Sequence, residues 1–396
     1  MVQVLAEQRP PWSDEQRALL ERHAPSLGFD PQDAHRATAA DTMAEWPPNR
    51  LARDDGAVIA DGDDLALAIL TDYPCGLAAA ADDRLIGGSD PVAAALVLQE
   101  RHPPVAYGRI VQADDGRTWL QYWLFYYDNP KHLFGWGRHQ GDWELVQVEL
   151  DAAGTPVTVT GSQHEHAETR PFRAVAPEGR PVVYVAPFSH ANYFAPRTRF
   201  YFPGADHPFG GGPRLVPEVR PFGEWSRWPG RWGADRGRPL AGLAPIGRSP
   251  AGPAHQHGRW EDPAGFAAPP PAAPLAAALK SLVWTAGKLL APAKPEVSAA
   301  ALRGRQLTVG WRGAARHLLV TAHRPEPPFA MLRSAVLRDV APAGATELCL
   351  PEDVDECAVW VSTYNRLRQR SWPAGLPGAP DAGEPAPYRV LQAPAG

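Results

Sequence analysis

The sequence contains little cysteine, methionine or lysine. Its 396 residues include three cysteines, three methionines and four lysines. Three cysteines cannot build a disulfide framework. Cys349 and Cys357 could face each other across a hairpin, which would leave Cys75 over, but buried free thiols in a reducing compartment are the simpler interpretation.

The sequence also has no long hydrophobic run. A membrane-spanning helix needs about 20 apolar residues, and the most apolar stretch, residues 272–290, is interrupted by Lys280, Ser281 and Lys288. No basic region followed by an apolar core begins the chain, so we expect no secretory signal. The default location is therefore the cytoplasm, with export by a dedicated machinery left open; the oligomeric state is left undetermined.

Positive charge is not in excess. The chain has 39 Lys and Arg against 44 Asp and Glu, a net charge of −5, which argues against a nucleic-acid-binding protein. A glycine-rich phosphate loop, a nucleophile elbow and a CxxC pair are absent. These absences exclude the common nucleotide-binding, serine-hydrolase and thiol-redox motifs.

Short β-type runs separated by turn residues dominate what is present. Residues 105–111 and 118–127 flank an Asp-Gly turn, which is typical of a hairpin. The further runs are 143–150, 156–161, 181–186 and 199–202. The pattern predicts a mostly β fold with a large β-sandwich domain over residues 1–268.

A second, smaller sandwich is predicted after a proline-rich break. Residues 269–294 read as a Pro-rich linker and a helix, residues 295–373 as a sandwich, and residues 374–396 as a disordered tail. Trp311 on an early strand and Tyr364-Asn365 near the last make the unit similar to a fibronectin type III domain.

The block of residues 121–150 carries most of the chemistry. In a strand, Asp142 and Glu144 share a face with Val146, Val148 and Leu150, so both carboxylates point to the core side. Two carboxylates placed there repel each other and lose hydration, so they need a metal, an arginine or shared protons.

Two further residues complete a candidate metal site. His139 lies in a Gly-flanked turn before Asp142, and Asp128 ends the preceding aromatic strand. Such a set suits Mg²⁺, Ca²⁺ or Mn²⁺ better than structural Zn²⁺. The alternative is a network in which Asp142 and Glu144 pair with Arg138 or Arg109 and His139 caps a turn.

The HxxDWE motif resembles the GHRHDWE region of the necrosis- and ethylene-inducing peptide family. That resemblance implies a divalent cation held by the residues Asp128, His139, Asp142 and Glu144. The family's second His is replaced here by Gly141, whereas the His–Asp–Glu spacing is kept.

A longer resemblance, over about residues 20–265, is to the vacuolar protein sorting-associated protein 62 family. It rests on an ordered set of segments: APSLGFDPQD, LQYWLFYYDN, HQGDWE, SQH, VVYVAPFSHANY, GRWG, SPAGP and RWEDP. The family implies an architecture and a site more firmly than an activity. Gln140 replaces its usual acid, which lowers the local charge.

Four more residues are candidates for contacting a ligand. His164 and His190 follow predicted strands at a sandwich rim and are also candidate proton carriers, while Trp225 and Trp228 lie in a loop region and are expected at the surface. The first hypothesis is a divalent-cation-dependent protein that binds a glycan or a lipid headgroup. The alternatives are a hydrolase using a metal-activated water and a structural protein with a buried ion-pair network.

Overall fold

The protein was analysed as a computed structural model that divides into two compact units. The structure describes residues 4–8, 11–130, 137–164, 166–197, 199–201, 204–210, 212, 214–236, 247–268, 292–313, 316–326, 330–351, 354–364 and 388–392. The first unit comprises Met1–Leu27, His35–Phe194 and Leu215–Pro270, and the second comprises Gly28–Ala34, Ala195–Arg214 and Pro271–Gly396. Strands dominate both units, which confirms the mostly β prediction.

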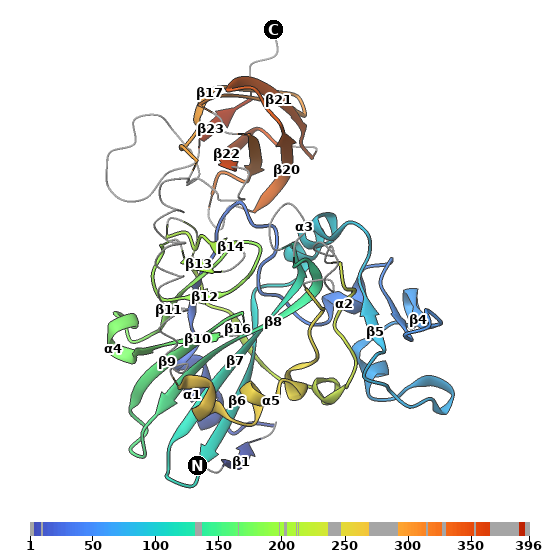
Figure 1. The fold of residues 1–396 in the computed structure, drawn as a ribbon, viewed down its shortest axis with the longest axis vertical. Helices are drawn as coiled ribbons and strands as arrows, with labels where there is room; N and C mark the ends of the chain where they lie inside the picture. Colours follow the sequence, from blue (N-terminus) through green and yellow to red (C-terminus); the bar gives the residue numbers. More distant parts are fainter. Residues whose placement is uncertain are drawn as a thin grey trace. The chain divides into compact units, whose positions relative to one another are not determined.

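A seven-stranded sheet forms the frame of the first unit (Figure 1). Its order is β1-β6-β7-β8-β9-β10, and β16 pairs in parallel with β6. The strands are β1 (Val4–Gln8), β6 (Val105–Ala113), β7 (Thr118–Asn129), β8 (His139–Leu150), β9 (Pro156–Gln163), β10 (His166–Pro171) and β16 (Glu218–Pro221). The antiparallel β6–β9 run includes the hairpins that the turn residues predicted.

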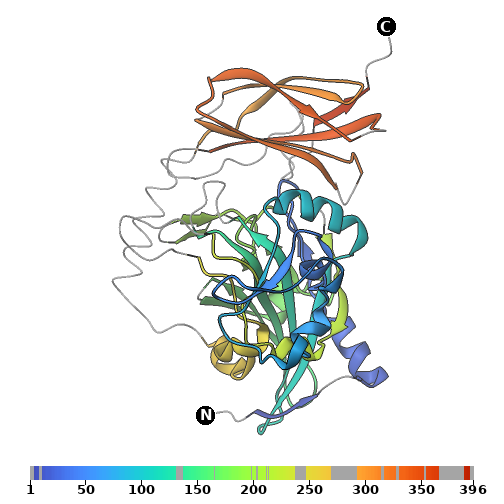
Figure 2. The ribbon, with the colours of Figure 1, turned by 90° about the vertical axis from the view of Figure 1, so that its right-hand side faces the viewer.

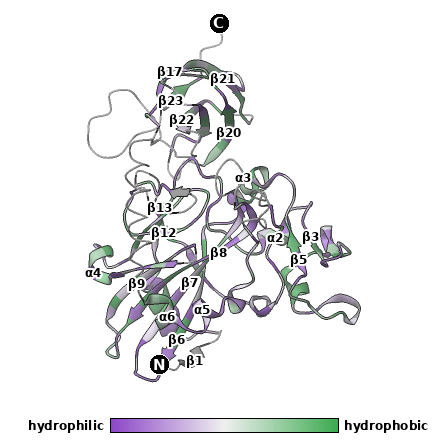
Figure 3. Cartoon of the chain, in the orientation of Figure 1, coloured by the Kyte–Doolittle hydropathy of each residue, from purple (hydrophilic) through white to green (hydrophobic). Residues whose placement is uncertain are grey.

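Strands β7 and β8 are buried on both faces, which explains their apolar and aromatic composition. Trp123 lies opposite Leu145, and Phe125 lies opposite Trp143. These residues pack into one core with the buried rings of Trp228, Trp232 and Trp260. Polar residues also occur along the sheet, and Figure 3 shows hydrophilic and hydrophobic positions mixed on its strands. Some of these polar residues are therefore buried inside the unit.

Shorter helices, turns and strands come before, between and after these strands in the sequence. The helices are α1 (Asp14–His23), α2 (Thr42–Glu45), α3 (Pro91–Arg101), α4 (Phe172–Val175), α5 (His257–Trp260) and α6 (Pro263–Ala267); the 3-10 turns are η1 (Gly62–Asp64), η2 (Leu67–Leu70), η3 (Pro74–Gly76), η4 (Glu224–Arg227) and η5 (Pro253–His255). A small sheet has the order β4-β3-β5, from β3 (Arg50–Ala52), β4 (Val58–Asp61) and β5 (Arg84–Ile86). The remaining short strands are β2 (Ser26–Gly28), β11 (Val182–Val185), β12 (Asn192–Tyr193), β13 (Arg199–Tyr201), β14 (Gly204–Asp206) and β15 (Arg214–Leu215). The capping box of Ser13 and Gln16 begins α1.

The second unit is a sandwich of two antiparallel sheets, seen as two layers in Figure 2. One sheet is β17-β18-β21 and the other is β20-β19-β22-β23. The strands are β17 (Glu296–Arg303), β18 (Gln306–Arg312), β19 (His317–His323), β20 (Met331–Arg338), β21 (Ala343–Cys349), β22 (Glu356–Tyr364) and β23 (Tyr388–Leu391). One apolar core joins residues of both sheets, including Trp311 and Val361.

The second unit differs from its predicted limits in two ways. Residues 28–34 and 195–214 belong to it, because the Gln32 side chain binds carbonyls of β19 and β22. The tail expected to be disordered contains β23, which pairs with β22. The predicted helix at residues 275–290 lies outside the described residues.

Two further sequence predictions concern membranes and thiols. No helix among the described residues is long and apolar enough to cross a bilayer. Cys349 and Cys357 are both free thiols, the first exposed and the second buried. Burial raises the pKa of Cys357 to about 12, which makes this thiol inert.

Candidate functional site

A cavity of about 550 Å³ opens in the first unit where β7 ends and β8 begins. Three of the four predicted metal ligands line it: His139, Asp142 and Glu144. His164 lines the same cavity, as the sandwich-rim prediction required. The other polar side chains in the lining are Asn129, Ser189, Arg231, Arg248, Ser249, Gln256 and Arg259.

Gly141 sets the direction of the chain into this cavity. Its φ is +62°, and a Cβ placed there would lie 1.9 Å from the carbonyl oxygen of Trp232. The backbone N–H of Gln140 also donates to the Ala234 carbonyl, 3.0 Å away. Only glycine combines the positive φ with so close a backbone neighbour, so Gly141 holds Asp142 at the cavity.

Two side chains, Asn129 and His190, hold the Asp142 carboxylate in place. Its Oδ2 accepts a hydrogen bond from the Asn129 amide at 2.9 Å and lies 3.0 Å from Nδ1 of His190. Burial by itself raises the pKa of Asp142, but the His190 hydrogen bond, the charges of His139 and His190, and the Asn129 bond outweigh burial and lower the pKa. Asp142 is therefore a carboxylate at neutral pH.

His190 contacts Asp142 but is not among the residues that line the cavity. It is fully buried, and its ring stacks flat on Tyr126 with 3.9 Å between centroids. Its backbone has a φ of +54°, a strained value for a residue with a side chain. The prediction that His190 contacts a ligand is therefore corrected: it reaches the cavity only through Asp142, because the loop after β11 turns its ring inward.

His139 presents a defined tautomer. Its Nδ1 lies 2.7 Å from the Gly141 carbonyl oxygen. A carbonyl can only accept, so Nδ1 carries the proton and the neutral ring has its lone pair on Nε2. This nitrogen is suited to accept a hydrogen bond or to bind a metal.

Glu144 is held by a buried hydroxyl group. The Ser162 hydroxyl donates to the Glu144 carboxylate, and its oxygen accepts from the Leu145 amide at 2.8 Å. Asn192 also donates to this oxygen, at 3.3 Å. The contact fixes the carboxylate beside Asp142 on the same face, as strand alternation predicted.

Asp128 is separated from the other predicted ligands. It lies opposite Gln140 on the neighbouring strand β8. Its carboxylate is 3.5 Å from the Arg138 guanidinium group. Burial raises the pKa of Asp128 to about 6, against the opposing effect of Arg138 and Arg236. The described part of the chain contains no cluster of three His, Cys, Asp or Glu side chains placed to hold a metal ion. The set of four ligands therefore does not fit a cation as predicted.

The predicted surface tryptophans lie in the core instead. Trp228 is buried and donates to the Tyr73 hydroxyl at 2.8 Å, and Trp225 packs on Trp143 and Trp232. Loop sequence around them suggested exposure, but this loop covers β7 and β8, whose aromatic face the tryptophans complete. They are structural residues rather than ligand contacts.

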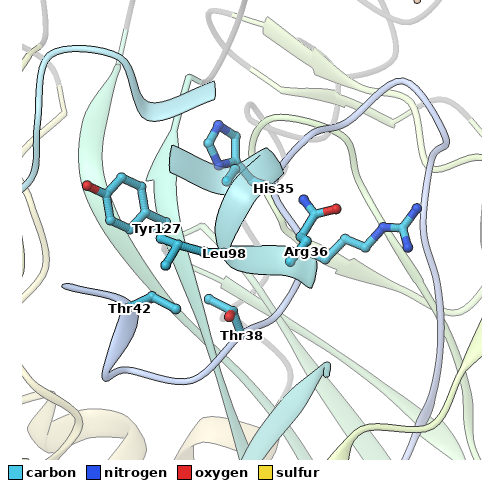
Figure 4. A pocket seen from close by; sticks show the side chains of 8 residues that line it. His35, Arg36, Thr38, Thr42, Leu98 and Tyr127 are labelled. Atoms are coloured by element: carbon cyan, nitrogen blue, oxygen red, sulfur yellow. The ribbon is translucent and has the colours of Figure 1, made fainter. Parts of the chain in front are cut away.

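A second, much smaller cavity lies behind β7. Figure 4 shows the side chains of His35, Arg36, Thr38, Thr42, Leu98 and Tyr127 around it. Its volume of about 10 Å³ is close to the minimum for one water molecule. Burial, followed by the charges of His190 and Arg138, lowers the pKa of His35 to about 3. His35 is thus neutral and structural, and this cavity is too small for a ligand.

Several cavity residues were not predicted from the sequence. Asn129 follows Asp128 directly, but nothing local shows that its amide turns to Asp142. Arg259 comes from α5 and donates to the carbonyls of His164 and Trp143. Only the packing of α5 against β8 brings this arginine to the carboxylates.

Comparisons with known proteins return solved structures of low similarity. No family model and no curated protein matches the chain. The similar solved structures include "Toxin fold as basis for microbial attack and plant defense" (15% identity, TM-score 0.29, 56% of this chain and 80% of that chain). They also include "NLPPya in complex with glucosamine" (17%, 0.29, 54% and 77%) and "NLPPya in complex with mannosamine" (14%, 0.29, 54% and 77%).

The first of these structures is described as a toxin fold. At these values the likeness says nothing about function. The resemblances to the vacuolar protein sorting-associated protein 62 family and to fibronectin type III gain no support.

Proposed function

We propose that the first unit is a binding module for a saccharide, taken up as a free glycan or as the sugar headgroup of a lipid. The observation that carries this proposal is the gathering of polar groups in one cavity of about 550 Å³. That volume lies within the range of small-molecule sites.

The chemistry of the lining supports a ligand with many hydroxyl groups. Asp142 and Glu144 supply acceptors, Arg259 supplies donors, and Asn129 and Gln256 supply both. Hydroxyl groups donate and accept, so a sugar can use all three kinds of partner.

A divalent cation in the same cavity is the second part of the proposal. His139, Asp142 and Glu144 supply nitrogen and oxygen ligands of the kind such ions use. Asp128 is excluded from this smaller set by its position beside Arg138. A cation would have to draw these three side chains together, because among the described residues they are not placed as a metal cluster.

The test is to titrate the full chain with neutral methyl glycosides and to measure binding by calorimetry. The titration is done first in chelator and then with Ca²⁺, Mg²⁺, Mn²⁺ or Zn²⁺. Asp142→Asn and Glu144→Gln should each weaken binding about tenfold, because each removes a charged acceptor. Asp72→Asn, an exposed carboxylate outside the cavity, is the matched control.

Absence of binding to every glycoside would contradict the saccharide proposal. Equal affinity and an equal melting temperature with and without each cation would contradict the cation part alone. Release of a cleaved product from a glycan would show the hydrolase alternative instead.

A further inference from the structure

The three arginines that line the cavity, Arg231, Arg248 and Arg259, have no carboxylate partner among the described residues. Arg231 donates to the Ser249 carbonyl at 3.1 Å. Arg259 donates to two carbonyls and to the amide oxygen of Gln256. The hydrogen-bond partners of Arg231 and Arg259 are neutral, so none of the three guanidinium groups forms an ion pair within the described residues.

Some other arginines among the described residues are paired with acids. Arg84 forms an ion pair with Asp235 at 3.2 Å, and Arg138 lies 3.5 Å from Asp128. Others, such as Arg180 and Arg333, donate to backbone carbonyls as the cavity arginines do. The cavity is distinguished by number: in a chain of net charge −5, its lining has three guanidinium groups against two carboxylates.

Arg259 is also oriented before any ligand arrives. Its three hydrogen bonds use three of the five guanidinium N–H groups. Within the described residues, the Nε–H and one N–H on Nη2 remain for a further acceptor. A planar guanidinium held in this way suits bidentate binding of a carboxylate, sulfate or phosphate.

We infer that the saccharide bound by this cavity is acidic, with its anionic group at Arg231, Arg248 and Arg259 and its hydroxyl groups at Asp142 and Glu144. This inference rests on the proposed saccharide-binding function and adds the charge of the ligand. The two kinds of charge in the lining orient such a ligand, because a pose with its anion on the carboxylates would be repelled.

The experiment compares the affinity of the full chain for four ligands at low salt: methyl glucoside, methyl glucuronide, glucose 6-sulfate and glucose 6-phosphate. At least one acidic sugar should bind ten times more tightly than methyl glucoside, and this preference should shrink as salt is raised. The acid that binds most tightly identifies whether carboxylate, sulfate or phosphate is the natural group.

Arg248→Gln is the first variant, because Arg248 is exposed and its loss leaves the fold intact. It should reduce the preference for the acid threefold or more. Arg259→Lys keeps the charge and loses the planar fork, so it should reduce the preference as well. Arg173→Gln, an exposed arginine on α4, is the control and should change nothing.

Equal affinity for neutral and acidic sugars would overturn the inference and leave the proposed function standing. A preference for the acid that Arg248→Gln and Arg259→Lys both leave unchanged would also overturn it. If no sugar binds, the proposed function fails, and the inference fails with it.

Discussion

Asp128 and Asp142 are buried carboxylates on neighbouring strands, yet their pKa values move in opposite directions. Asp142 has the His190 ring and the Asn129 amide within hydrogen-bond distance, which favours the charged form. For Asp128, burial is the largest influence and raises the pKa to about 6. The difference comes from the partner atoms rather than from burial, which the two residues share.

The raised pKa of Asp128 leads to a prediction about stability and pH. The folded protein binds this proton more tightly than the unfolded chain, so the charged residue costs free energy above pH 6, and the cost disappears as pH falls below 4. Asp128→Asn should therefore raise the free energy of unfolding at pH 7.5 by about 1–3 kcal/mol. Urea denaturation from pH 4 to 8 measures this; a gain at pH 4 as large as at pH 7.5 would contradict it.

At the scale of the element, the beginning of strand β8 depends on Gly141. Gly141→Ala adds both a strained φ and a clash with the Trp232 carbonyl, whereas Gly154→Ala adds the strain alone, because nothing lies within 4 Å of its Cβ. We expect a loss of about 1 kcal/mol for Gly154→Ala and at least about 3 kcal/mol for Gly141→Ala.

Chemical denaturation of both variants tests this comparison. Glycoside binding should also fall for Gly141→Ala, since Asp142 moves with the strand, and should be unchanged for Gly154→Ala. Equal losses of stability in the two variants would show that the close contact with Trp232 does not matter.

A second element-scale prediction concerns residues 28–34. The Gln32 amide donates to the carbonyls of Leu319 and Trp360 and to the Thr321 hydroxyl, and Ser362 donates to its oxygen. Gln32→Leu leaves these buried groups without their partner and should cost about 1–3 kcal/mol of stability.

The matched control is Gln306→Leu, because Gln306 is exposed and donates to a single exposed carboxylate. It should change the stability by less than about 0.5 kcal/mol. Hydrogen exchange at β19 and β22 reports the effect directly. Unchanged protection of these strands in Gln32→Leu would argue that residues 28–34 are not part of the second unit.

At the scale of the whole molecule, ligand binding should stabilise the first unit and leave the stability of the second unit unchanged. Every described residue that lines the cavity belongs to the first unit. A sugar present at about 100 times its Kd should stabilise that unit by about 2.7 kcal/mol. Hydrogen exchange should then slow at residues 139–164 and 231–259 and remain the same at residues 296–364. Slowed exchange confined to the second unit would place the site elsewhere.

Local pattern determined the strands and part of the site. Residues 118–127 and 143–150 read as buried strands, and they form β7 and β8. Alternation placed Asp142 and Glu144 on one face, and both line the cavity. These properties depend on neighbours within a few positions, so periodicity contains them.

Only the tertiary structure decided which distant residues meet. It placed His190 under Asp142, although 48 positions separate them, and it brought Arg259 to a strand 116 positions earlier. It also left Asp128 out of the cavity lining and placed it beside Arg138. Contacts across such separations follow from the packing of whole elements, and no short-range pattern in the sequence specifies them.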